Sequence, residues 1–331
     1  MSLLHNSKQL LVLLKETFPA TKLTLIYGSG AFAQSGRSKG KMLDILFAVD
    51  DPMKWHTENI ITNPDHYSFA RYLSTSNLYR IQRAAAGVYY NPFIKLQGLD
   101  SLIKYGVISV ASLKKDLEEW STIYVSGRMH KPVLLMDICP ELNTASSLNL
   151  SSAIRTALLM LPETFNLKDL FRSITGISYK GDIRMGIAED SNKVDNIVTA
   201  NYSAFKQLYD SKLYGTFNHC IHINTDDDVI QDKSIHRTKL HISRLPLTLL
   251  HRLASKIGWA QVYYRTLKLE DFVQTISDKN VENLSDGIAL SLEEIIAITS
   301  VSQSAKGILT AGLWKSVIYS YEKVKKGFGI T

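Results

Sequence analysis

The chain has 331 residues, of which 45% are hydrophobic and 21% are charged, a composition that describes a soluble globular protein of about two domains. Its two cysteines, Cys139 and Cys220, exclude a disulfide framework, and no apolar run approaches the roughly 20 residues that are needed to cross a bilayer. The net charge of +7 indicates an anionic partner, such as a nucleotide, a nucleic acid or an acidic lipid.

The first predicted elements are a helix and two strands. Residues 7–18 carry leucines at helical spacing and are ended by Pro19, which predicts an amphipathic helix. Residues 23–27 and 42–49 are short apolar runs bounded by turn residues. Each run fits a strand that is covered on both faces better than it fits a helix. We therefore expect the first helix to lie against a sheet that contains both strands.

The turn between these strands carries the first sign of chemistry. Gly28 and Gly30 let the backbone turn tightly and approach a ligand, while the Ser29 hydroxyl and neighbouring N–H groups can hold phosphate oxygens. Asp44 stands inside the second apolar run, and a buried carboxylate must be paired, hydrogen-bonded or bound to a cation. The pattern predicts phosphate on the loop and a metal ion on the aspartate.

Two other phosphate-binding motifs fit these residues less well. Residues 28–33 match the dinucleotide fingerprint G-x-G-x-x-A, with Asp50 as its ribose acid, but that motif requires a helix between the strands. Residues 34–41 hold two glycines and three cations, which disfavour a packed helix. A Walker A loop is absent, because no Gly-Lys-Ser or Gly-Lys-Thr follows at the required spacing.

A short Gly-Ser loop that leads to an acid on the next strand resembles the nucleotidyltransferase fold of polymerase-β-like enzymes. That fold usually carries Asp-x-Asp or Asp-x-Glu on the strand. Here Leu46 stands two positions after Asp44, so a second metal-binding carboxylate must come from elsewhere. By local pattern the favoured residue is Asp137, which has apolar neighbours in a strand predicted over residues 133–138.

The segment after the second strand concentrates polar and aromatic residues. Asp51 and Pro52 begin a predicted helix, and residues 63–65 cap another. Two interpretations stay open: a helical hairpin with half-buried rings, and one wall of a nucleotide pocket. The residues concerned are Trp55, His56, Asn59, Asn63, His66 and Tyr67.

Cations precede the last predicted strand of the first half. Residues 87–94 predict a strand and a turn, and residues 110–120 predict a helix. Arg128, His130 and Lys131 then stand just before the strand at 133–138, where cations can meet phosphates. The alternative is a basic surface turn.

The second half predicts a smaller, helical unit. Residues 140–149 are small and polar, which marks an expected domain boundary. Two short helices and an extended segment over residues 176–185 would suit a winged-helix-like unit, although such a fold does not give a function. Helices are expected over residues 150–161, 167–174, 196–209, 245–253 and 292–298, with a hairpin or loop over 219–229.

Several segments, taken in order, carry a closer resemblance. They are Tyr27-Gly28-Ser29-Gly30, Met42-Leu43-Asp44, Trp55-His56, His66-Tyr67-Ser68, Val88-Tyr89-Tyr90-Asn91, Ser126-Gly127-Arg128-Met129-His130-Lys131, Ser178-Tyr179-Lys180-Gly181-Asp182-Ile183-Arg184-Met185 and Lys306-Gly307-Ile308. Together they resemble the mitochondrial phosphatidate cytidylyltransferase family, also called the translocator assembly and maintenance family. The resemblance runs from Tyr27 nearly to the end of the chain.

The resemblance implies an α+β fold in three parts. These are a nucleotidyltransferase domain (residues 1–145), a winged-helix-like domain with a segment that returns to the active site (146–250), and a C-terminal helical region with a basic membrane-facing tail (251–331). It implies a Mg²⁺-dependent enzyme that makes CDP-diacylglycerol and pyrophosphate from CTP and phosphatidic acid, for cardiolipin and phosphatidylglycerol synthesis. It also implies a peripheral place on the matrix side of the mitochondrial inner membrane, although residues 1–6 show no clear presequence.

The resemblance also assigns roles in the site. Asp44 becomes a metal ligand, and Gly28, Ser29 and Gly30 cradle the triphosphate. Arg128 and Lys131 become phosphate clamps. For the second metal carboxylate the resemblance favours Asp182 over Asp137 and Glu189, because Asp182 lies in a family motif and follows a glycine.

Partners and alternatives follow from the same residues. The tail after Ala311 has lysines at 315, 323, 325 and 326 among apolar residues, which predicts contact with an anionic membrane surface. No nucleic acid is expected as a partner, and self-association as a homo-oligomer stays open. The alternatives are a nucleotidyltransferase that acts on RNA or protein, and a non-enzymatic membrane-associated assembly factor.

Overall fold

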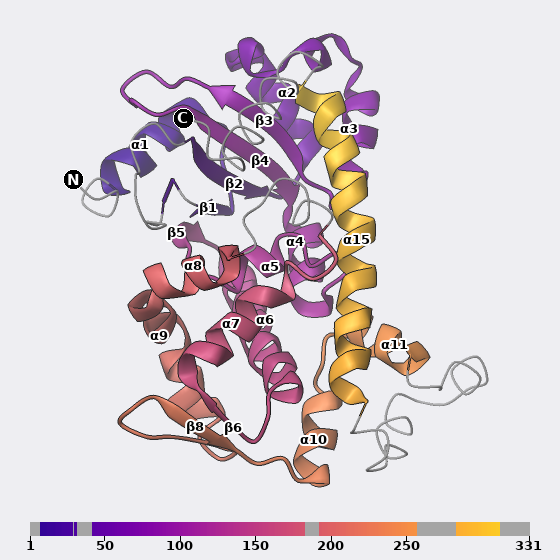
Figure 1. The fold of residues 1–331 in the computed structure, drawn as a ribbon. Helices are drawn as coiled ribbons and strands as arrows, with labels where there is room; N and C mark the ends of the chain where they lie inside the picture. The colour runs from indigo at the N-terminus through magenta and orange to yellow at the C-terminus, as the bar shows by residue number, and fades with distance from the viewer. Residues whose placement is uncertain (1–6, 29, 32–41, 183–191, 257–282, 312–331) are drawn as a thin grey trace.

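A computed structural model describes residues 7–28, 30–31, 42–182, 192–256 and 283–311. Figure 1 shows an upper lobe built around one sheet and a lower lobe of helices with a small second sheet. The long helix α15 (Leu284–Ala311) runs along both lobes. The fold is therefore mixed α and β, as expected.

The upper sheet has five strands in the order β3-β4-β2-β1-β5. β2 and β4 are parallel, whereas the other neighbours are antiparallel, so the sheet is mixed. Four strands confirm the predicted runs, but β4 was not predicted. The strands are β1 (Leu23–Tyr27), β2 (Leu43–Val49), β3 (Tyr89–Ile94), β4 (Ile103–Ser109) and β5 (Leu134–Ile138).

Helices cover both faces of this sheet, which is why its strands read as continuous apolar runs. One face, with Ile45 and Phe47 of β2, packs against leucines of α1 (Ser7–Thr17). The other face, with Leu46 and Ala48, packs against α4 (Val110–Glu119) and α6 (Pro140–Met160). Since side chains alternate along a strand, Asp44 projects from the same face as Leu46.

Short helices and 3-10 turns complete the upper lobe. α2 (Pro52–Thr62) begins at Asp51, whose carboxylate accepts hydrogen bonds from the Met53 and Lys54 amides at 2.8 and 3.2 Å, and this confirms the predicted cap. The short 3-10 turns η2 (Pro64–His66) and η3 (Phe69–Tyr72) lead to α3 (Thr75–Arg83). The four-residue α5 (Ser126–Met129) then joins the two lobes.

The lower lobe has one apolar core that α6 and α7 share with the later helices. Its small sheet has the order β6-β8-β7 and is antiparallel. Its elements are β6 (Thr164–Asn166), α7 (Leu167–Ile177), α8 (Lys193–Ala200), α9 (Tyr202–Ser211), η4 (Lys212–Thr216), β7 (Ile221–Ile223), β8 (Asp228–Gln231), α10 (Ile235–Ile242) and α11 (Leu247–Lys256).

Three local predictions in this half were wrong. Residues 140–149 are not a connection but the first half of α6, because Ala145, Ser146 and Asn149 are small enough to be buried in it. The extended segment predicted from residue 176 instead begins as the end of α7 and a turn. The helix predicted over 196–209 is two helices that meet at Asn201.

α15 ties the lobes together by contacts near both of its ends. In the lower lobe, Arg252 and Lys256 of α11 form ion pairs with its Glu294. In the upper lobe, Gln303 donates to the Val88 carbonyl at 3.0 Å, and Lys306 donates to the Gln82 and Ala84 carbonyls at 2.8 and 2.9 Å. No helix in the described ranges is long and apolar enough to cross a membrane.

One glycine fits this arrangement closely enough to test it. Gly181 has a φ of +70°, and a Cβ there would lie 2.6 Å from the backbone oxygen of Glu293 in α15. Gly181→Ala should therefore lower the free energy of unfolding by about 1–3 kcal/mol, measured by urea denaturation. Gly176→Ala is the matched control, since its Cβ would meet open space on a helix, and it should leave stability unchanged or raise it. Equal effects of the two substitutions would contradict this packing.

Candidate active site

The glycine turn lies directly against Asp44. β1 and β2 pair so that Tyr27 is opposite Asp44, and the chain turns at Gly28 with a φ of +79°. A Cβ on Gly28 would lie 3.0 Å from Asp44 Oδ2, and one on Gly30 would lie 2.7 Å from the Met42 carbonyl oxygen. Gly28 therefore allows the turn to pass close to the carboxylate, and Gly30 allows it to pass close to the backbone before β2. Ser29 lies outside the described residues.

Cations and tyrosines surround the carboxylate. Lys104 is opposite Asp44 on β4, and its Nζ lies 4.0 Å from Asp44 Oδ1. The Arg128 guanidinium lies 3.9 Å from the centre of the Tyr124 ring and 5.4 Å from that of Tyr27. Burial raises the pKa of Tyr27, while the charges of Arg128 and Lys104 oppose this and that of Asp44 adds to it. One acid and two cations thus gather around one phenol.

Lys131 and Lys193 form a second group of cations, beside Arg128 of the first group. The Lys131 Nζ donates to the Gly127 carbonyl at 2.6 Å and to Ser178 Oγ at 2.7 Å. Both Lys131 and Lys193 lie over the Tyr179 ring, at 4.9 and 5.2 Å from its centre. Burial, with the nearby charges of Arg128 and Lys193, holds the pKa of Lys131 well below its usual value. A bound anion would relieve this repulsion, so the cluster fits phosphate.

A buried carboxylate positions the segment that carries these cations. Asp116 Oδ1 accepts from the Thr122 amide and hydroxyl at 2.8 and 2.6 Å, and its Oδ2 accepts from the Val125 and Ser126 amides, both at 2.9 Å. Four bonds to one carboxylate fix the backbone just before Arg128. The loop also holds Ile123 at a φ of +54°, a conformation that an isoleucine rarely adopts.

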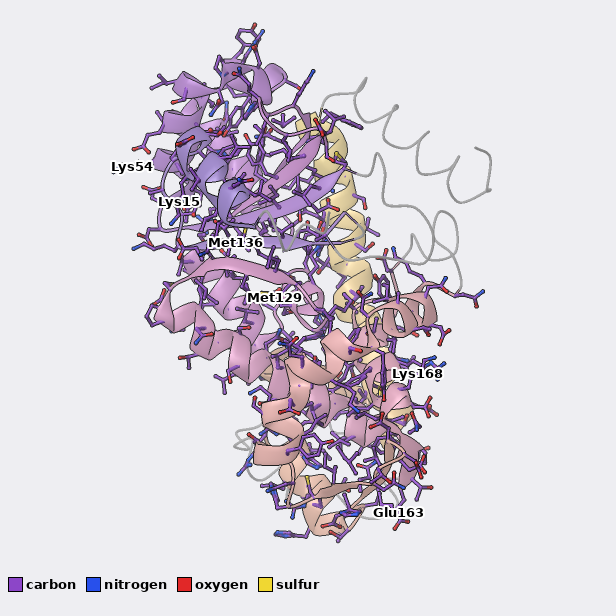
Figure 2. The ribbon with its side chains drawn as sticks, turned by 90° about the vertical axis from the view of Figure 1, so that its left-hand side faces the viewer. Lys15, Lys54, Met129, Met136, Glu163 and Lys168 are labelled. Carbon is purple, nitrogen blue, oxygen red and sulfur yellow. The ribbon has the colours of Figure 1, made fainter. Side chains whose placement is uncertain are left out.

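The lower lobe holds the same segment from its other side. Asn149 of α6 donates to the Ser126 carbonyl at 3.0 Å, and its Oδ1 lies 2.9 Å from His130 Nε2. Burial, helped by the charge of Lys131, lowers the pKa of His130 to about 3, so the ring is neutral and Nε2 donates. Figure 2 shows Met129 between the labelled residues of the upper lobe (Lys15, Lys54) and those of the lower lobe (Glu163, Lys168).

Asp182, expected as the second metal ligand, contacts α15. It is 7% exposed, and Ser300 Oγ donates to its Oδ1 at 2.8 Å. Within the described residues, no three His, Cys, Asp or Glu side chains lie close enough together to form a metal site. The metal role of Asp182 therefore stays a prediction, and Glu189 lies outside the described residues.

Asp137, favoured by local pattern, stands on the other face of the sheet. It lies beside Thr24 at the far end of β1 and forms an ion pair with Lys15 of α1 at 3.2 Å. Because α1 covers the face opposite Asp44, Asp137 is poorly placed to share a metal ion with it.

The residues around Asp44 fit one Mg²⁺ ligand. The Asp44 side chain is 28% exposed, and the missing Cβ of Gly28 leaves room beside Oδ2. Mg²⁺ is usually held by one or two carboxylates together with substrate phosphates and water, so a single protein carboxylate beside a phosphate cradle is compatible with it.

The polar and aromatic cluster proves to be a buried network on the α2 face. His56 Nδ1 lies 2.7 Å from the Tyr67 hydroxyl, and Asn59 donates to the Tyr67 and Tyr105 hydroxyls at 3.0 and 2.9 Å. Burial lowers the pKa of His56 to about 4. These residues pack across the sheet from Asp44, which favours the structural interpretation over a pocket wall.

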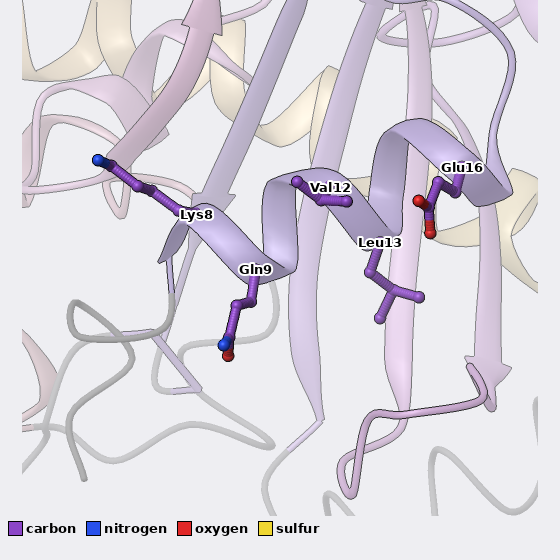
Figure 3. A pocket seen from close by; sticks show the side chains of 5 residues that line it. All are labelled: Lys8, Gln9, Val12, Leu13 and Glu16. Carbon is purple, nitrogen blue, oxygen red and sulfur yellow. The ribbon is translucent and has the colours of Figure 1, made fainter.

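A shallow depression on the outer side of α1 does not belong to this site. Figure 3 shows Lys8, Gln9, Val12, Leu13 and Glu16 along it. α1 covers the sheet face opposite Asp44, so this depression is separated from the cation clusters by the sheet.

Sequence reasoning missed several residues of the site. The sequence contained a sign of Lys104, because this lysine is the one charged residue in the run Ile-Lys-Tyr-Gly-Val-Ile-Ser of β4. Asp116 and Asn149 had none, since each acts through contacts with residues that the sequence pattern does not bring together. The residues around the site to which the sequence analysis gave no role are Tyr27, Tyr90, Lys104, Asp116, Tyr124, Asn149 and Lys193.

Comparison with known proteins gives one consistent result. The sequence model of a family described as "Phosphatidate cytidylyltransferase, mitochondrial" matches residues 11–326. Proteins of that name from Danio rerio and Xenopus laevis are 39% and 40% identical over 315 and 311 residues, each covering 92% of this chain and 90% of the relative. The protein of that name from Schizosaccharomyces pombe is 36% identical over 320 residues, which is 91% of this chain and 79% of the relative.

The neutral, buried state of His130 predicts a pH dependence of stability. Its folded pKa of about 3 lies below the unfolded value of about 6.5, so below pH 6.5 only the unfolded chain takes up the proton. Stability should therefore fall with pH in that range, by up to about 1.4 kcal/mol per pH unit from this residue. His130→Gln keeps a donor toward Asn149 and removes the titration. Between pH 7 and 5 the free energy of unfolding of this variant, measured by urea denaturation, should fall by about 2 kcal/mol less than that of the wild type. Identical losses would contradict this assignment.

Proposed function

Because this chain belongs to the mitochondrial phosphatidate cytidylyltransferase family, we propose that it transfers CMP from CTP to phosphatidate, giving CDP-diacylglycerol and pyrophosphate. The observation that carries the proposal is the carboxylate of Asp44 between a glycine turn and two groups of cations. We further propose a peripheral place on the matrix side of the inner membrane and a role in supplying cardiolipin and phosphatidylglycerol.

We propose that the upper lobe is a nucleotidyltransferase domain and the lower lobe a winged-helix-like domain. The first proposal is supported by the antiparallel pair β1–β2 with its Gly-Ser-Gly turn and by an acid at the start of β2. The second is supported by a small three-stranded sheet next to the α6–α7 helices.

In the proposed reaction, a phosphatidate oxygen forms a bond to the α-phosphorus of CTP. The bond from that phosphorus to the β-phosphate oxygen breaks, and pyrophosphate leaves with the electron pair. Such transfer depends on positioning and charge neutralisation. Arg128 and Lys131 would clamp the triphosphate over the turn at Gly28 and Gly30. Lys104 and Lys193 would add positive charge where the two anionic substrates meet.

Mg²⁺, when bound, would supply further charge neutralisation at the phosphate oxygens. Asp44 would hold it, and we propose Asp182 as the second carboxylate. Gly181 packs against Glu293 of α15, and Asp182 accepts a hydrogen bond from Ser300 of the same helix. These contacts would then connect the lower lobe and α15 to the site.

The deciding experiment incubates the purified chain with labelled CTP, Mg²⁺ and liposomes that contain phosphatidate. Formation of labelled CDP-diacylglycerol with release of pyrophosphate is expected. Labelling of RNA or of a protein without any need for phosphatidate would favour the alternative nucleotidyltransferase. If no pyrophosphate is released at any Mg²⁺ concentration, the chain is better explained as an assembly factor.

Asp44→Asn keeps the shape of the side chain and removes its charge. We expect a folded protein whose turnover falls by at least ~100-fold, the scale of losing one electrostatic contributor in such a site. Asp50→Asn is the matched control, because Asp50 follows β2 and is exposed in an ion pair with Lys22. Near-normal turnover of Asp44→Asn at saturating Mg²⁺ would exclude Asp44 as a ligand.

The second carboxylate is tested by Asp182→Asn and Asp137→Asn side by side, with melting temperature, CTP binding and turnover measured for each. Asp182→Asn should lose turnover, and Asp137→Asn should stay close to the wild type because it lies on the α1 face. Ser300→Ala separates a structural role of Asp182 from a role as metal ligand, since it removes the hydrogen bond from α15 but keeps the carboxylate. An active Asp182→Asn beside a folded, inactive Asp137→Asn would reverse the assignment.

A further inference from the structure

The outward face of α3 is basic and aromatic. Leu78 and Gln82 face inward and are 2% exposed, which turns Tyr79, Arg80 and Arg83 toward solvent. Tyr79 is 37% exposed, and Tyr72, which closes the preceding turn, is 77% exposed. Both rings are therefore open to solvent beside these arginines.

Charge on this part of the chain has one sign. Residues 66–99 contain three arginines and one lysine but no aspartate or glutamate. Asp65 forms an ion pair with Arg71 at 3.3 Å, which neutralises one of them. Within the described ranges, no carboxylate lies within ion-pair distance of Arg80 or Arg83. The remaining positive charge therefore faces solvent.

The cations lie beside the exposed rings. The Arg71 guanidinium lies 4.8 Å from the centre of the Tyr72 ring, and that of Arg83 lies 5.5 Å from the centre of Tyr79. Such pairs combine an apolar ring and stem with a polar head, the combination that suits the boundary between water and lipid.

α15 ends at the same end of the molecule. Lys306 is 4% exposed, and its hydrogen bonds to the Gln82 and Ala84 carbonyls fix it to the end of α3. Figure 1 shows the final turns of α15 beside α3. The described part of the helix extends to Ala311, about 7.5 Å further along its axis. Residues 312–331, which follow in the sequence, contain four lysines and one glutamate.

α3 packs on the α2 face of the sheet, where Leu78 is buried with Tyr67 and Tyr89. This face lies across the sheet from Asp44, so the outward side of α3 is a surface separate from the candidate active site.

From these observations we propose that the outward face of α3, together with Tyr72, is a docking surface for a bilayer of anionic phospholipid. The inference rests on the proposed function, because a phosphatidate substrate is itself an anionic membrane lipid. Charge complementarity selects this occupant: the surface offers unpaired arginines and interfacial tyrosines, and the bilayer offers phosphates and an apolar boundary.

The test is sedimentation of the full chain with liposomes of phosphatidylcholine containing phosphatidate, at low and high salt. The variant Arg80→Gln/Arg83→Gln should bind about 25-fold more weakly at low salt, since each cation near an anionic membrane contributes about fivefold. Tyr72→Ser/Tyr79→Ser should weaken binding further at high salt, where the charges are screened. The control Lys115→Gln/Arg252→Gln removes the same net charge from exposed ion pairs on α4 and α11, and it should bind like the wild type.

A turnover assay on dispersed short-chain phosphatidate separates this inference from the proposed function. The α3 variants should keep wild-type turnover there and lose it on liposomes. If the wild type turns over neither substrate, the proposed function fails, while sedimentation still decides the docking surface. Equal binding of wild type and α3 variants overturns the proposal. So does equal weakening by the control, or failure of the wild type to bind anionic liposomes, which would leave the face to an acidic protein or a second copy.

Discussion

The arrangement of the site depends on how one short segment is held between two cores. Trp120 and Ile123 are buried in the core of the lower lobe, whereas Val125 and Met129 are buried in that of the upper lobe. The chain must therefore cross the junction within ten residues, and the four hydrogen bonds to Asp116 fix the path that it takes. Arg128 and Lys131 follow at once, so their positions are set before any ligand arrives.

The fixed position of this segment brings several cations close together. Cations at the junction are buried beside one another, which is unfavourable unless anions join them. Without an anion, aromatic faces and carbonyl groups stabilise these charges, as Tyr179 and the Gly127 carbonyl do for Lys131. The neutral His130 belongs to the same arrangement, because a second positive charge beside Lys131 would add to the repulsion. Preorganised positive charge of this kind is what transfer between two anionic substrates requires.

The sequence was sufficient for those parts of the site that are local. The runs before and after Gly28, the turn itself and Asp44 are neighbours along the chain, so their pattern predicted both strands with the turn between them. Asp116 and Asn149 could not be predicted in this way, because their roles arise from partners brought near by packing. The segment 140–149 was predicted as a domain boundary for a related reason. Its small, polar residues are typical of a connection, but in the structure they form part of α6, which is buried against α4. At Asn59 the sequence left two interpretations open, and its buried hydrogen bonds to Tyr67 and Tyr105 favour the structural one.

The contacts of α15 have a consequence for how the chain folds. Gln303 and Lys306 bind groups that precede them by 215 to 224 positions along the chain, and those groups belong to the upper lobe. The upper lobe is thus completed by a segment that is synthesised at least 215 residues after the groups it binds. Closing such long loops is slow, since their entropy must be lost before the contacts form. Until α15 docks, the Val88 carbonyl before β3 and the last carbonyl groups of α3 lack these partners, so the upper lobe reaches its final packing only after α15 has been made.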